Sequence, residues 1–203
     1  MTDILKYSLI PDKSITSIIL PPRNIFQTSS ILAKEQVLEI ASWIDKKEVA
    51  YKINSLPYEF KLILRGSRDG FGKDAFWNLC DQKTNIVVVA KVKDTDEIVG
   101  GYNPKGWDSN FMGKFFETND SFIFSLKNRN IKNHILSRVK NASEGIYHNP
   151  KYGSNFCNDF FMEGNELFRI YGIRSYEKLI RKTTGEFSID DYEVFQISKR
   201  KNI

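Results

Sequence analysis

Side chains that could act as nucleophiles, bases or thiolate ligands are few in this sequence. It contains two histidines, His134 and His148, and two cysteines, Cys80 and Cys157. A nucleophilic site needs a serine or cysteine beside a positioned base, usually histidine, and both histidines lie in polar stretches that predict solvated turns. The cysteines are far apart and lack the spacing of a zinc site or a redox motif. The sequence therefore predicts no metal site, no cofactor and no catalytic constellation.

Two further clusters could carry chemistry. The glycine-rich run 66–72 (GSRDGFG) suggests a phosphate cradle, but it has neither a Gly-Lys-Ser/Thr ending nor a G-x-G-x-x-G register. Its glycines instead predict a tight connection between a strand and a helix. The carboxylates Asp190, Asp191 and Glu193 precede the last apolar run, and such groups can do acid and base work when held apart. Asp190 and Asp191 are predicted in a turn and Glu193 in a strand, so a structural role is favoured.

An enzyme is the alternative prediction. It would use Cys80 or Cys157 as a thiolate or Glu193 as an acid, and it would require an accessible thiol of low pKa or a buried carboxylate in a pocket. Cys80 closes an apolar helix face with Phe76 and Trp77. That position favours a buried, inert thiol.

Length and composition indicate one intracellular domain. The chain has 203 residues, of which 41% are hydrophobic, enough for a single sizeable core. Its net charge of +5 is spread along the chain, and basic residues are not interleaved with stacking aromatics, which argues against a specific nucleic-acid partner. No signal peptide and no run near the roughly 18 apolar residues of a membrane span is present. We expect a cytoplasmic protein.

Periodicity predicts the elements. The predicted organisation has three parts. Residues 1–27 are expected to form a poorly ordered lead-in, residues 28–197 the domain, and residues 198–203 a basic tail. Helical spacing predicts a helix over 31–44 with Ser30 as its N-cap, and a second over 73–80. Alternation and β-branched runs predict strands at 59–65, 85–92, 98–102, 121–126, 135–139, 145–148, 167–172 and 192–197.

Gly100 and Gly101 mark a bulge or a close backbone approach in the predicted hairpin of strands 85–92 and 98–102. Short strands between turn residues, with only two helices, favour a mainly β fold with flanking helices. The expected architecture is a β-sandwich of two antiparallel sheets.

Several motifs, in order, resemble a TLDc domain. They are the strand 60–65, GSRDGFG, the helix that ends at Cys80, NIVVVAKV, IVGGYNP, TNDSFIFSL and the closing YEVF. The resemblance covers about 31–197, while 150–161 and 178–185 depart from the family pattern. The helix 31–44 resembles the one that introduces such domains in fungal proteins with BTB and BACK modules.

The resemblance implies a β-sandwich without an established catalytic mechanism, a role in resistance to oxidative stress, and binding to subunits of the vacuolar proton-pumping ATPase. The matching positions form the predicted interaction or motif set, and most are expected to support the fold: Ser67, Arg68, Asp69, Gly70, Gly100, Gly101, Asp120, Ser121 and Glu193.

Overall fold

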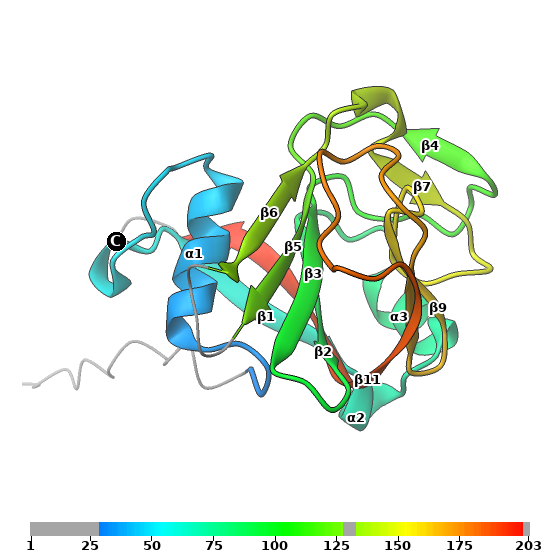
Figure 1. Ribbon diagram of the computed structural model, residues 1–203, viewed down its shortest axis with the longest axis horizontal. Coiled ribbons are helices and arrows are strands. Elements are labelled where there is room, and N and C mark those ends of the chain that lie inside the picture. The colour runs from blue at the N-terminus through cyan, green and yellow to red at the C-terminus, as the bar shows by residue number, and fades with distance from the viewer. Residues whose placement is uncertain (1–28, 128–132, 201–203) are drawn as a thin grey trace, which may run out of the picture.

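The computed structural model describes residues 29–127 and 133–200 (Figure 1). The predicted lead-in at 1–27 lies outside these residues, as do the last three residues of the predicted basic tail. Of the helices in the described part, none is long and apolar enough to cross a membrane.

Antiparallel strands make up most of the fold. Along the chain they are β1 (Tyr58–Arg65), β2 (Ile86–Val92), β3 (Glu97–Asn103), β4 (Lys114–Phe116), β5 (Phe122–Lys127), β6 (Ile135–Arg138), β7 (Ile146–His148), β8 (Asn155–Phe156), β9 (Phe160–Gly164), β10 (Leu167–Ile170) and β11 (Gly185–Lys199). A nine-stranded sheet runs β6-β5-β3-β2-β11-β10-β9-β8, with β1 also paired to β11, and β4 and β7 form a second, two-stranded sheet. The predicted mainly β fold with antiparallel sheets is confirmed.

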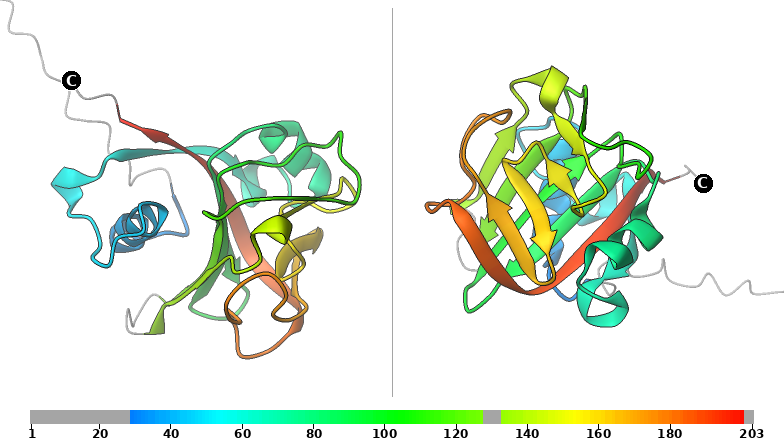
Figure 2. Two further views of the ribbon diagram at one scale, coloured as in Figure 1. Left: turned by 90° about the horizontal axis from the view of Figure 1, so that it is seen from above. Right: turned by 90° about the vertical axis from the view of Figure 1, so that its right-hand side faces the viewer.

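The long strand β11 joins the two layers of the sandwich. The main layer contains β6, β5, β3, β2 and β1, and the smaller layer contains β10, β9 and β8. Its first residues pair with β10, and from Ile189 onward it pairs with β2 on one side and, from Glu193, with β1 on the other. The register with β2 shifts between Ile189 and Asp191, and such a bulge bends and twists a strand. Figure 2 shows β11 curving from the main layer into the smaller one. The two layers are therefore parts of one sheet.

The main layer is buried on both faces. Along β2, Ile86, Val88 and Ala90 pack in the core shared with β8 to β10, whereas Val87 and Val89 pack in a second core under α1 (Lys34–Ile44). Successive side chains of a strand point to opposite faces, so a strand covered on both sides needs apolar residues at every position. This burial explains the continuous apolar run at 86–90.

Helix α1 begins later than predicted. Its N-cap is Ala33, whose backbone N–H donates to the Gln36 side chain at 2.8 Å. The predicted N-cap, Ser30, lies outside the helix and donates instead to Glu193. The prediction was wrong because a distant buried carboxylate competes successfully for the serine.

The remaining elements include both confirmed and unexpected features. The short helix over 73–80 is confirmed as α3 (Lys73–Cys80), but the preceding polar loop forms a helical turn, α2 (Gly66–Asp69). Asp190 and Asp191, predicted in a turn, lie within β11. Strands β4, β8 and β9 were not predicted. Ser198 and Lys199, assigned to the tail by the sequence, continue β11.

Candidate functional site

The turn α2 is held against β11 by a glycine and a carboxylate. A Cβ at Gly66 would lie 2.7 Å from Tyr192 Cδ1 and 2.9 Å from Asp191 Oδ1, so only glycine fits there. The Asp191 carboxylate accepts the backbone N–H of Ser67 at 2.9 Å and its hydroxyl at 2.6 Å. An oxygen acceptor at the start of a helical turn satisfies amides that have no partner within it. Residues 67–70 are thereby fixed together on the surface (Figure 1).

Arg68 and Asp69 form an oriented ion pair on this turn. Two nitrogens of the Arg68 guanidinium donate to the two Asp69 oxygens, each at 2.8 Å, and Asp69 also accepts the backbone N–H of Arg65 at 2.9 Å. The hydrogen bonds from Arg68 lower the pKa of the Asp69 carboxyl. The Arg68 side chain is 52% exposed, so the pair adds little stability but presents a fixed charge pattern to a partner.

Glu193 is fully buried in β11 and organises the inner side of this region. One carboxylate oxygen accepts the Arg65 Nε–H at 2.8 Å and the backbone N–H of Ser30 at 2.9 Å, and the other accepts the Ser29 hydroxyl at 2.5 Å. A buried carboxylate is tolerated when it is paired and hydrogen-bonded in this way. Both oxygens are therefore committed to holding the segment before α1 and the end of β1.

The other predicted positions lie elsewhere and support the fold. A Cβ at Gly100 would lie 2.3 Å from the Val88 carbonyl oxygen, and one at Gly101 would lie 2.6 Å from the Phe156 ring. The predicted close backbone approach is thus the correct alternative, since the register of β2 and β3 shows no bulge.

Ser121 and Asp120 have different environments. Ser121 is buried, and its hydroxyl donates to the Tyr102 carbonyl at 2.8 Å. Asp120 is exposed and pairs with Lys46 at 2.7 Å, beside the end of α1. Of the nine predicted positions, the structure therefore brings Ser67, Arg68, Asp69 and Gly70 together, and Glu193 is connected to this turn through Arg65.

The two cysteines are free and fully buried. Burial raises the pKa of the Cys80 thiol to about 12 and that of Cys157 to about 11. Reactive cysteines have lowered pKa values and some exposure. The expectation of a buried Cys80 is confirmed, and neither thiol has the environment of a nucleophile.

The sequence predicts a solvated turn for each histidine, but neither side chain is solvated. His148 is part of β7, is 3% exposed and stacks on Phe116 with 3.8 Å between ring centroids. Its Nδ1 accepts the backbone N–H of Asp108 at 3.1 Å, and burial lowers its pKa. The His134 side chain contacts Glu39 of α1 at 2.7 Å. His134 does lie directly before β6, as predicted, but the predicted solvation was wrong for both side chains, because distant aromatic and acidic residues cover them.

Two carboxylates with structural roles could not be assigned from sequence. In the sequence, Asp191 is marked only as a member of an acidic cluster. Asp159 is buried and accepts three consecutive backbone N–H groups, those of Arg174, Ser175 and Tyr176. Burial raises its pKa. A single aspartate in an irregular segment carries no sequence signal for this role, because its partners lie 15 to 17 residues away.

Within residues 29–127 and 133–200, no group of three or more His, Cys, Asp or Glu side chains is arranged to hold a metal ion. The fold and this surface define a mainly antiparallel β domain with an exposed charged turn. The family model described as TLDc domain matches residues 25–198, and the chain belongs to that family. Comparison with curated proteins gave no match.

Proposed function

We propose that this TLDc domain is a non-catalytic interaction module of the cytoplasm. Its partner would be a subunit of the vacuolar proton-pumping ATPase, and its role would lie in regulating that pump and in resistance to oxidative stress. Membership in the family supports the partner and the role. The observation that supports a binding surface is the exposed Arg68–Asp69 pair on a turn held rigidly by Asp191.

A fixed, exposed charge pair suits recognition better than catalysis. Charges placed at an interface select partners and steer their approach. Fixing them before binding reduces the conformational entropy lost on association. The α2 turn meets both conditions, because backbone and side-chain bonds already set its geometry.

The alternative function is that of a hydrolase or thiol-dependent redox enzyme that uses Cys80 or Glu193. It is less well supported. The Cys80 thiol is buried with a raised pKa. The Glu193 carboxylate is occupied by Arg65, Ser29 and Ser30.

The test is a pulldown of the purified peripheral sector of the pump with the immobilised chain, read by mass spectrometry. The test variant exchanges the charges of the pair, Arg68→Glu with Asp69→Arg. Its matched control exchanges another surface pair of similar exposure, Arg174→Glu with Glu144→Arg. Near-ultraviolet circular dichroism establishes that both variants keep their packing.

Retention by the wild type and the control, but not by the α2 variant, is the expected result. Equal retention by all three chains would move the interface away from α2. No retention by any chain would contradict the proposed partner.

A further inference from the structure

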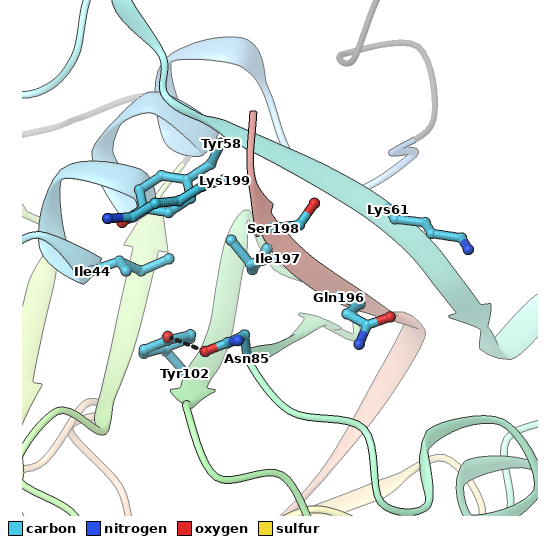
Figure 3. A pocket seen from close by; sticks show the side chains of 9 residues that line it. All are labelled: Ile44, Tyr58, Lys61, Asn85, Tyr102, Gln196, Ile197, Ser198 and Lys199. Carbon is cyan, nitrogen blue, oxygen red and sulfur yellow. Dashed lines mark hydrogen bonds between the residues drawn. The ribbon is translucent and has the colours of Figure 1, made fainter. Parts of the chain in front are cut away.

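A notch lies where the paired strands β1 and β11 extend beyond the end of β2. The ladder between β11 and β2 ends near Gln196 and Ile86, and the Ile197 N–H donates to the Asn85 carbonyl at 2.8 Å. Beyond this point β11 continues to Lys199, still paired with β1. The notch holds a cavity of about 660 Å³ (Figure 3), lined by Ile44, Tyr58, Lys61, Asn85, Tyr102, Gln196, Ile197, Ser198 and Lys199.

The backbone of Lys199 faces this notch. The Arg200 N–H donates to the Pro57 carbonyl at 2.8 Å, so the backbone groups of Arg200 point toward the β1 side. In an antiparallel ladder, consecutive residues direct their N–H and C=O groups to opposite neighbours. Those of Lys199, like those of Ile197, therefore point to the β2 side, where β2 has already ended. This short stretch of open strand edge can pair with an added strand.

Two lysines reach the notch from opposite faces of the ribbon. Lys61 lies across from Gln196, and Lys199 lies across from Tyr58. Gln196 and Lys199 are three positions apart in one strand, so the two lysine side chains belong to opposite faces. Figure 3 shows Lys199 beside Tyr58 and Lys61 on the other side of β11. Both lysines are exposed.

Among the described residues, the lining carries no negative charge that would compete with a ligand. No aspartate or glutamate lines the notch, and neither lysine has an ion-pair partner in the described part of the chain. The nearby Asp45 carboxylate is engaged by the hydroxyls of Tyr58 at 2.6 Å and Tyr51 at 2.5 Å.

The floor of the notch is apolar and its walls are rich in donors. Ile44 and Ile197 supply the floor, beside the rings of Tyr58 and Tyr102 (Figure 3). The Tyr102 hydroxyl donates to Asn85 Oδ1 at 3.0 Å, which leaves the amide nitrogen of Asn85 as a donor. Burial raises the pKa of Tyr102 to about 12, so this hydroxyl stays protonated at neutral pH.

We propose that this notch binds an extended acidic peptide of a partner protein, which adds a strand to the open edge of β11. The backbone of Lys199 would pair with the peptide main chain, in the mode known for strand addition. Consecutive side chains of the added strand point to opposite faces. Two neighbouring acidic residues would therefore reach Lys61 and Lys199, one on each face of the ribbon. Carboxylates on alternate residues would share one face and reach only one lysine.

This inference rests on the proposed function in one respect, that the domain binds another protein. It concerns a surface separate from α2. The two can fail independently. A chain with the Arg68→Glu and Asp69→Arg exchange is expected to bind the acidic peptide as the wild type does.

The experiment measures fluorescence anisotropy of short labelled peptides with the full chain. The test peptide carries a central Glu-Glu pair between valine and threonine residues. A second peptide of the same composition places the glutamates on alternate positions, and a third replaces both with glutamine. Saturable binding is expected for the first peptide, weaker binding for the second, and the weakest for the third, which loses both charge contacts and should bind about five- to tenfold less tightly than the first.

The matched variants are Lys61→Gln with Lys199→Gln and, as control, Lys151→Gln with Lys178→Gln, all at exposed positions. Loss of two partly solvated charge contacts should weaken binding of the first peptide about five- to tenfold, while the control should bind normally. Amide signals of Asn85 and Lys199 should shift on titration. The proposal is overturned by an absence of saturable binding, by equal binding to the double variant, or by equal binding of the first two peptides.

Discussion

The buried carboxylate of Glu193 accepts both the backbone N–H of Ser30, at 2.9 Å, and its hydroxyl, at 3.0 Å. The two residues are 163 positions apart, and their contact joins the segment before α1 to the centre of the main sheet. Ser29 reinforces it, because its hydroxyl donates to Glu193 and accepts the N–H of Leu32. Glu193 thus ties the segment before α1 to the sheet, in addition to the apolar core that lies under the helix.

Replacing Glu193 with glutamine should destabilise the domain by about 2 to 4 kcal/mol, since removal of one partner from a buried ion pair leaves the other without compensation. The Arg65 side chain is 25% exposed, so the loss of stability should be smaller than for a fully buried ion pair. The free energy of unfolding in urea measures it. In hydrogen exchange, the Ile31 and Leu32 amides should lose protection first. Glu117→Gln, at an exposed position, is the control, and an equal effect of both substitutions would contradict the structural role of Glu193.

Alanine at Gly100 or Gly101 should lower stability by about 1 to 3 kcal/mol or more, as overpacking does in well-packed cores. The Gly100 change should be the worse, because its Cβ would meet the Val88 backbone at 2.3 Å, whereas the ring beside Gly101 can shift. Gly172→Ala is the matched control, because nothing lies within 4 Å of its added Cβ. Thermal unfolding of the three variants ranks them, and an unchanged melting temperature for Gly100→Ala would refute the close packing.

Both cysteines should react slowly in the folded protein. With pKa values of about 12 for Cys80 and about 11 for Cys157, no more than about one thiol in a thousand is ionised at pH 8, and both are shielded from solvent. Modification by a chromogenic disulfide reagent should accelerate at least about a hundredfold in urea, where the thiols return to an ordinary pKa. Rapid reaction of either thiol in the native state would revive the thiol-enzyme alternative.

His148 should make stability fall with acidification. Its burial lowers the pKa in the folded state below the ordinary value, so the unfolded chain takes up the proton first. Above about pH 6.5 the neutral His148 contributes fully to the free energy of unfolding. This contribution decreases as the pH falls from there toward the lowered pKa of the folded state. His148→Gln keeps an acceptor for the Asp108 N–H but does not titrate. Urea unfolding between about pH 8 and pH 5 should show a shallower slope for this variant, and identical slopes would disprove the contribution of His148.

Local patterns predicted most elements, and they failed where the decisive contacts are distant. The apolar run of β2 and the alternation of β1 identified strands directly, because burial on the sheet follows the side-chain period. Strands β4, β8 and β9 do not alternate between buried and exposed residues, so no period of two marks them in the sequence. The two aspartates inside β11 resembled a turn, although Asp191 instead caps α2.

By itself, the sequence determined the order of the principal strands, the two longer helices, the mainly β class and the TLDc family, because these depend on local periodicity and on motifs in linear order. Only the tertiary structure decided the roles of single residues. Ser30 binds Glu193 in preference to capping α1, His148 is buried among aromatic rings, and Lys61 and Lys199 meet at one notch. Each of these outcomes depends on partners far away in the chain. The environment of a side chain is set by such contacts, which no local pattern contains.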